Sequence, residues 1–147
     1  MDKITGAGFL VFLDNTDGQI EDLEKDHLVL CLYANDGYYD FPKGSIDPGE
    51  FSLDCAFREM REEANLSEDD VVWSGNLDQN FVCGKLLVLY PAIVKPTSIY
   101  NIRCKRNPES GIIEHKGHGW HSIESCKSKV YPFLKDSLMW GKNILFK

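Results

Sequence analysis

The sequence has no apolar run close to the roughly 18 residues that a membrane-spanning helix requires, and its first residues show no secretory leader. It also has no Cys-x-x-Cys pair, no Cys and His cluster with zinc spacing, no internal repeat and no low-complexity tract. These absences argue against a membrane partner, a zinc module and a repeat array. The five cysteines are scattered and odd in number, so we expect reduced thiols and a cytoplasmic location.

The sequence has fewer positively than negatively charged residues, with 16 Lys and Arg against 23 Asp and Glu, and its net charge is −7. A protein that binds duplex DNA needs a clustered positive surface, so we expect no duplex DNA partner. The 147 residues are 43% hydrophobic and 12% aromatic, which is enough for one sizeable core. We therefore expect a single domain over residues 1–147, as a monomer or a homodimer.

Short apolar segments around one helical pattern predict an α/β fold, a mixed sandwich of strands and helices. Strands are expected at residues 8–13, 27–33, 38–41, 71–73 and 119–123. Residues 80–94 are also expected to be mostly strand, with a turn at Gly84. Residues 42–49 hold two Pro and two Gly and should be irregular, and 96–111 should be a polar loop. Residues 131–140 predict a C-terminal helix whose apolar residues include Phe133 and Leu134.

The clearest helical pattern runs from Ser52 to Ala64. Its apolar residues recur at i, i+3, i+4, i+7 and i+11 and form one stripe: Leu53, Ala56, Phe57, Met60 and Ala64. Ser52 is a candidate N-cap, and Asn65 stands where a left-handed residue commonly ends a helix.

Three carboxylates, Glu59, Glu62 and Glu63, share another face of this helix because they are spaced i, i+3 and i+4. Such a face is either a solvated acidic surface or a cation site. The Gly- and Pro-bearing loop that leads into the helix favours the cation site, and Arg58 can orient a neighbouring carboxylate. With no His or Cys in the cluster, an all-oxygen site suits Mg²⁺ or Mn²⁺, which share coordination positions with substrate phosphates.

These residues resemble the Nudix box, Gly-x5-Glu-x7-Arg-Glu-U-x-Glu-Glu-x-Gly-U, in which U is bulky and apolar. The match spans residues 44–66, from Gly44 through Glu50 to Leu66, and departs only at Asn65, where the family has Gly. The resemblance implies the Nudix fold, with a mixed β-sheet in an α/β/α sandwich. It also implies an enzyme that cleaves a phosphoanhydride bond by attack of water.

The resemblance further implies roles for the matched residues. Glu59, Glu62 and Glu63 would hold the divalent ion, with Gly44 at the same site. Arg58 would orient Glu59, and Glu50 would support the loop. In the family the metal lowers the pKa of a water that attacks phosphorus. The glutamate that acts as base and the number of metal ions stay open.

Residues 114–124, which begin Glu-His and include Trp120, resemble the same stretch of asymmetric diadenosine tetraphosphate hydrolases. This resemblance implies that Glu114 serves the metal site or acts as the base. The expected substrate contacts are Lys43 for a phosphate, Phe81 for stacking on adenine, and His115 and Tyr39.

A nucleoside polyphosphate is the expected substrate, and diadenosine tetraphosphate, cleaved to ATP and AMP, is preferred. RNA 5′-pyrophosphate removal or decapping is an alternative, because basic residues gather near 96–111: Lys95, Arg103, Lys105 and Arg106. A diphosphoinositol polyphosphate is a third substrate class. The alternative of another kind is a Nudix module that senses a nucleotide without cleaving it.

Overall fold

The computed structural model describes residues 3–72, 79–84, 86–105 and 110–146; Trp73 and Arg106 lie outside them. The strands are β1 (Gly6–Asp14), β2 (His27–Ala34), β3 (Tyr39–Asp40), β4 (Lys43–Ser45), β5 (Val71–Val72), β6 (Phe81–Cys83), β7 (Leu87–Val94) and β8 (His115–Ser122). The helices are α1 (Ser52–Ala64), α2 (Ile123–Lys127) and α3 (Lys135–Leu145), with 3-10 turns η1 (Glu68–Asp70), η2 (Pro96–Asn101) and η3 (Pro132–Leu134). Within these ranges, every helix is too short or too polar to span a bilayer.

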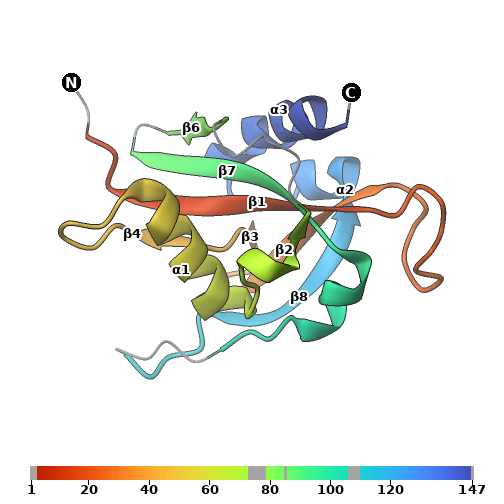
Figure 1. The fold of residues 1–147 in the computed structure, drawn as a ribbon, viewed down its shortest axis with the longest axis horizontal. Helices are drawn as coiled ribbons and strands as arrows, with labels where there is room; N and C mark the ends of the chain where they lie inside the picture. The colour runs from red at the N-terminus through yellow and green to blue at the C-terminus, as the bar shows by residue number, and fades with distance from the viewer. Residues whose placement is uncertain (1–2, 73–78, 85, 106–109, 147) are drawn as a thin grey trace.

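Strand β1 lies at the centre of one mixed sheet with the order β3-β2-β1-β7-β5 (Figure 1). It runs parallel to β7 and antiparallel to β2 and β4. Strand β6 extends the sheet beside β7, and β8 extends it beside β2. A parallel neighbour requires a crossover connection, and the segment that contains α1 supplies it. The expected mixed sheet is therefore confirmed.

Alternate residues of β1 face two separate cores, because successive side chains of a strand point to opposite faces. Phe9 and Val11 pack in the core under α1, whereas Leu10 and Phe12 pack in the core under α2 and α3. Helix α1 thus covers one face of the sheet, and α2 and α3 cover the other (Figure 1). This arrangement is the α/β/α sandwich that the box implied.

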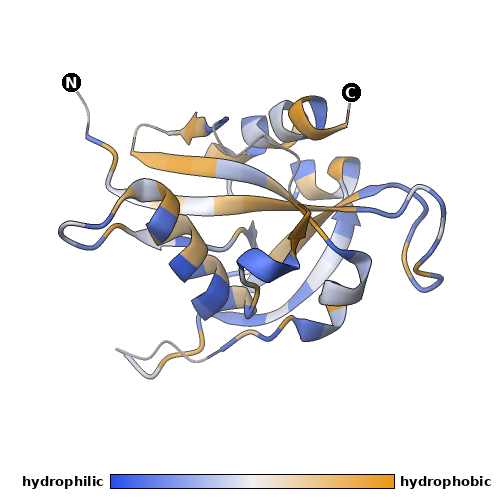
Figure 2. Ribbon diagram, viewed as in Figure 1, coloured by the Kyte–Doolittle hydropathy of each residue, from blue (hydrophilic) through white to orange (hydrophobic). Residues whose placement is uncertain are grey.

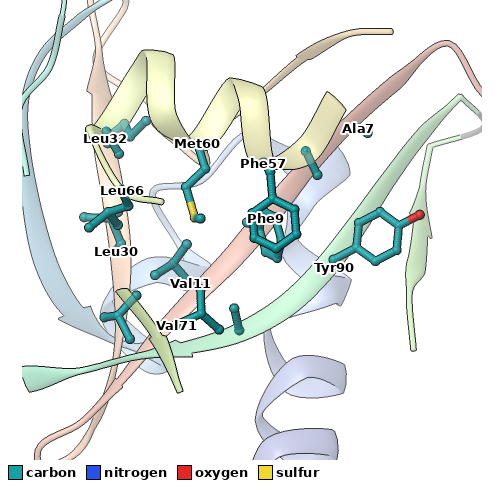
Figure 3. Packing of buried hydrophobic residues seen from close by; sticks show 14 of the residues in the cluster. Ala7, Phe9, Val11, Leu30, Leu32, Phe57, Met60, Leu66, Val71 and Tyr90 are labelled. Carbon is teal, nitrogen blue, oxygen red and sulfur yellow. The ribbon is translucent and has the colours of Figure 1, made fainter. Parts of the chain in front are cut away.

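The core under α1 fixes the helix against the sheet. Figure 3 shows Phe57 over Phe9, with ring centroids 4.7 Å apart, and Met60 directed at the same core. Burying one such side chain contributes about 1.5–3 kcal/mol. Figure 2 shows hydrophilic and hydrophobic residues alternating along α1, as expected of a helix with one buried face. The opposite edge of α1 is left for the acidic residues.

Some segments differ from the sequence expectation because tertiary pairing decides them. Residues 43–45, expected to be irregular, form β4 against Gly6–Gly8 of β1. The expected polar loop 96–111 begins with η2, and β8 begins at residue 115 rather than at 119. The C-terminal helix starts at Lys135, after η3, and leaves Phe133 47% exposed instead of on the buried face.

Candidate active site

Helix α1 has the bounds that its apolar stripe predicts, and the residue at its C-terminal cap is the expected one. Asn65 adopts φ 62° and ψ 30°, the left-handed conformation, and its side-chain amide donates to the carbonyl of Asn101 at 2.8 Å. Asparagine thus fills the glycine position of the box at modest cost. The first cap differs from the prediction. Phe51 is the N-cap residue, because the Ser52 hydroxyl instead contacts the Tyr90 hydroxyl at 2.6 Å.

Strand β4 lies directly on the acidic edge of α1. The Lys43 backbone N–H donates to Glu63 Oε1 at 2.7 Å. A Cβ atom on Gly44 would overlap the carboxylate of Glu59, so only glycine allows this close approach. The glycine of the box therefore has a local role here, because a side chain at this position would push the Glu59 carboxylate away from β4.

Arg58 joins the loop before α1 to the acidic edge. Its guanidinium donates to both carboxylate oxygens of Glu50, at 2.8 and 2.9 Å, and to Glu59 at 2.9 Å. Further bonds reach Glu62 at 3.3 Å and the carbonyl of Ser45 at 2.9 Å. The bidentate bond from Arg58 lowers the pKa of Glu50 to about 2. The geometry agrees with the orienting role that the box implied for Arg58 and the supporting role for Glu50.

Burial changes the pKa values of Glu59 and Glu63, the two glutamates that lie against β4. It raises the pKa of Glu59, although the neighbouring Arg58 works in the opposite direction. Burial, followed by a hydrogen bond with Glu114, raises the pKa of Glu63 to about 10. A divalent cation favours the charged form of both groups. The side chains fit such an ion in donor chemistry, and the Gly44 backbone leaves them room beside β4.

A second group of candidate ligands comprises Glu63, Glu114 and His115, whose ligand atoms lie within 4.8 Å of one another. His115 is 5% exposed, and its Nδ1 lies 3.7 Å from Glu63 Oε2. Its Nε2 lies 3.0 Å from Asp40 Oδ2. A histidine thus lies beside the carboxylates, and the all-oxygen ligand set stays a prediction. Sequence reasoning also missed Asp40, whose only signal was a carboxylate three residues before Lys43.

Of the residues expected to contact the substrate, some lie at the carboxylate site and others lie apart from it. Lys43 lies at the site, with its Nζ 3.2 Å from Asp40 and 6.0 Å from the ring centroid of Phe133. His115 is there too, but it is buried against carboxylates of the protein. Tyr39 does not join them. Its ring packs on Tyr33 in the core on the α2 and α3 side of the sheet.

Phe81 also lies apart from the carboxylates. It pairs with Leu89 of β7, which pairs with Gly8 of β1, which pairs with Lys43 of β4. Three strand spacings separate the backbone of Phe81 from that of Lys43, or about 14 Å. The Phe81 ring packs on Trp140 of α3, with centroids 5.4 Å apart. The structure therefore does not bring Phe81 to the acidic edge.

The family assignment agrees with this fold and this site. A model of the NUDIX domain matches residues 5–140, so the chain belongs to the Nudix family. It is a hydrolase of the class that cleaves phosphoanhydride bonds. Hydrolases of this family generally depend on a divalent metal ion.

Individual proteins of known name are similar to this chain. The asymmetrical bis(5′-nucleosyl)-tetraphosphatase of Mus musculus is 30% identical over 124 residues, covering 79% of each chain. The enzyme of the same name from Rattus norvegicus is 29% identical over 124 residues, with the same coverage. A C. elegans Ap4A hydrolase binary complex superposes with a TM-score of 0.70 at 20% identity, over 99% of this chain and 98% of the other. A MutT protein from Methanosarcina mazei has a TM-score of 0.62 at 16% identity, over 99% and 96%. The two structures support the fold.

Proposed function

We propose that this chain hydrolyses a dinucleoside polyphosphate, with diadenosine tetraphosphate cleaved to ATP and AMP. Mg²⁺ or Mn²⁺ would be held by Glu59, Glu62, Glu63 and Glu114 beside Gly44. The observation that carries the proposal is the packing of Glu59 and Glu63 against β4, with Glu114 at the same place. The names of the two rodent relatives support the substrate.

The protein's own groups would orient the substrate and handle the proton. Arg58 fixes the Glu59 carboxylate, and the Lys43 ammonium at the rim offers a point charge for a phosphate. Glu63 and Glu114 are the candidates for the base, because they share a hydrogen bond at the site and a bound divalent ion would favour the charged form of Glu63, which can accept a proton. A bound divalent ion would lower the pKa of a water and offset charge on the phosphate oxygens.

An aromatic surface beside Lys43 offers a place for a nucleoside base. Phe133 is 47% exposed, and its ring lies nearly parallel to that of Tyr131, with centroids 5.9 Å apart. Tyr131 in turn stacks on Tyr38 at 5.0 Å. Stacking of a base on such a ring contributes about 1–3 kcal/mol. This surface replaces Phe81 as the preferred stacking site in our proposal.

One substrate panel tests the proposal: diadenosine tetraphosphate, triphosphorylated RNA, capped RNA, ADP-ribose and a diphosphoinositol, each with Mg²⁺ and with Mn²⁺. Equal amounts of ATP and AMP from diadenosine tetraphosphate, at the highest kcat/KM of the panel, are the expected result. Phe133→Ala should raise KM for that substrate, whereas Phe51→Ala, an exposed control, should not. Nucleotide binding without turnover of any compound would indicate a sensing module instead.

Removal of pyrophosphate from RNA 5′ ends is the second candidate, and the position of the basic segment supports it. The Arg103 N–H donates to the carbonyl of Ala64 at 3.1 Å, so this segment runs past the C-terminal end of α1. Arg103 and Lys105 are both exposed there. A polyanion that extends beyond the carboxylates would meet them. Faster turnover of triphosphorylated RNA, with loss of this rate in Arg103→Gln, would favour this candidate over the first.

A further inference from the structure

We propose that His115 is itself a metal ligand. Its Nδ1, with the carboxylates of Glu63 and Glu114, forms a mixed nitrogen and oxygen site that binds a first-row transition ion such as Mn²⁺ or Co²⁺ more tightly than Mg²⁺. The inference deepens the proposed function, because it concerns the ion at the same site. It is tested without any substrate, so its failure and the failure of the proposed function are distinguishable.

The spacing of the three candidate ligands suits a single ion. Donor atoms bind such ions at about 2.1 Å, so two ligands on opposite sides are about 4.2 Å apart and adjacent ligands are closer. The ligand atoms of Glu63, Glu114 and His115 all lie within 4.8 Å of one another. The separation of 3.7 Å between His115 Nδ1 and Glu63 Oε2 matches adjacent positions around one ion.

The surroundings of His115 resemble those of a metal-bound histidine. Such a histidine commonly donates its other ring N–H to a carboxylate, which fixes the tautomer and the direction of the ring. Here Nε2 lies 3.0 Å from Asp40 Oδ2. Asp40 is itself held by the Phe41 N–H at 2.8 Å and by Lys43 Nζ at 3.2 Å. A proton on Nε2 leaves the lone pair of Nδ1 directed at Glu63.

Burial of His115, Asp40 and Glu63 separates this site from an ordinary surface contact, and Glu114 is the one exposed ligand of the three proposed. The side chains of His115, Asp40 and Glu63 are 5%, 9% and 10% exposed. The alternative interpretation is a structural ion pair, in which His115 carries protons on both nitrogens between two carboxylates. That arrangement would repel a cation, whereas a ligand role requires a free Nδ1. Metal binding therefore discriminates between the two interpretations.

The donor set decides which ion is preferred. Carboxylates and water suit Mg²⁺, whereas an imidazole adds a softer donor that suits first-row transition ions. A site made only of Glu59, Glu62, Glu63 and Glu114 would lack this preference. The distinguishing property is therefore the ratio of the dissociation constants for Mg²⁺ and Mn²⁺, together with a direct sign of nitrogen bound to the ion.

The experiment uses the metal-stripped wild-type protein with one equivalent of Mn²⁺. Pulsed electron paramagnetic resonance is expected to show coupling of the ion to a histidine nitrogen. The ¹⁴N coupling should be replaced by a ¹⁵N coupling when the histidines are labelled with ¹⁵N. Titration calorimetry should give a Mn²⁺ affinity about tenfold or more above that for Mg²⁺. His115→Gln should lose the coupling and most of the preference, whereas His27→Gln should keep both. His27 is a suitable control because it stacks on Phe146, away from the carboxylates.

Asp40→Asn keeps an acceptor for Nε2 but removes the charge, and it should weaken Mn²⁺ binding about 10-fold. Absence of nitrogen coupling in the wild-type protein would overturn the proposal, whether or not any variant folds. Coupling that persists in His115→Gln, or equal affinities for Mg²⁺ and Mn²⁺, would overturn it as well. None of these measurements depends on the cleavage of diadenosine tetraphosphate.

Discussion

Glu63 takes part in three separate contacts at the candidate site. It accepts the Lys43 N–H, shares a hydrogen bond with Glu114 and faces His115. Glutamine has nearly the same shape and can keep the bond from the Lys43 N–H, but it cannot supply a negative charge. Replacing Glu63 with glutamine therefore tests the role of the negative charge while the shape of the side chain and its bond from the Lys43 N–H are kept.

Glu63→Gln should lower kcat by about 100-fold or more, because Glu63 is a proposed metal ligand and a candidate base, and glutamine cannot supply its charge. The melting temperature of the ion-free variant should not fall, since the buried group is uncharged in both proteins at neutral pH. Turnover of diadenosine tetraphosphate in Mg²⁺ and thermal unfolding give the two readouts. Glu68→Gln, at an exposed glutamate, is the control, and full activity in Glu63→Gln would contradict the site assignment.

The raised pKa of Glu63 also predicts a pH dependence of stability. Its folded value is about 10 and its ordinary value is 4.5, so between these limits the ion-free native state holds a proton that the unfolded chain releases. This contribution to the free energy of unfolding is complete below pH 4.5 and is lost as the pH rises toward 10. Thermal unfolding in a chelator from pH 5 to 9 should show wild type losing stability relative to Glu63→Gln. Parallel curves would contradict the prediction.

At the scale of elements, the site depends on how α1 and β4 approach each other. The pairing of Ala7 with Gly44 fixes β4 on β1, and the aromatic contact between Phe9 and Phe57 fixes α1 on the same strand. The acidic edge of the helix therefore meets the β4 backbone at a distance that neither element sets alone. Steric change at Gly44 tests this contact.

Gly44→Ala should displace the Glu59 carboxylate and lower metal affinity about 10-fold or more, because the new methyl group would occupy its place. Calorimetric titration with Mn²⁺ measures the effect. Gly117→Ala is the matched control, since its Cβ would make only an ordinary contact of 3.4 Å with Tyr33. Equal affinities in the two variants would show that the β4 backbone does not shape the site.

The elements differ in how far the sequence determines them. Helix α1 could be predicted to its end residues, because its apolar period and Asn65 are local signals. Strand β4 could not, because only its pairing with β1 makes residues 43–45 extended. The residues of the candidate site divide in the same way. Glu59, Glu62 and Glu63 follow from helical spacing, whereas Asp40 and His115, 75 residues apart, meet only through the sheet.

Phe133 shows a further limit of local patterns. It stands beside Leu134 at a spacing that suits an apolar helix face, yet η3 directs it outward and Leu134 inward. For Phe81 the resemblance implies stacking on adenine, whereas its place in an apolar strand favours a core residue. Its place beside Trp140 depends on the packing of α3 on β6, which no short motif encodes.

At the scale of the whole molecule, bound metal should stabilise the fold, because its proposed ligands come from α1, β8 and the bend before β8. An ion at 100 times its dissociation constant adds about 2.7 kcal/mol to the free energy of unfolding. For a chain of this length we expect the melting temperature to rise by about 5–10 °C. Scanning calorimetry after chelation and after addition of Mn²⁺ checks this. An equal rise with KCl of matched ionic strength would contradict it.

Strand β1 is translated before the other described strands and yet occupies the middle of the sheet, between β2 and β7 and beside β4. Its parallel partner emerges from the ribosome only after residue 94, and Glu114 and His115 follow later. Distant pairings of this kind slow folding relative to helical bundles. The nascent chain therefore exposes its acidic helix before Glu114 and His115 exist, and the proposed cation site is completed only after residue 115 has been made.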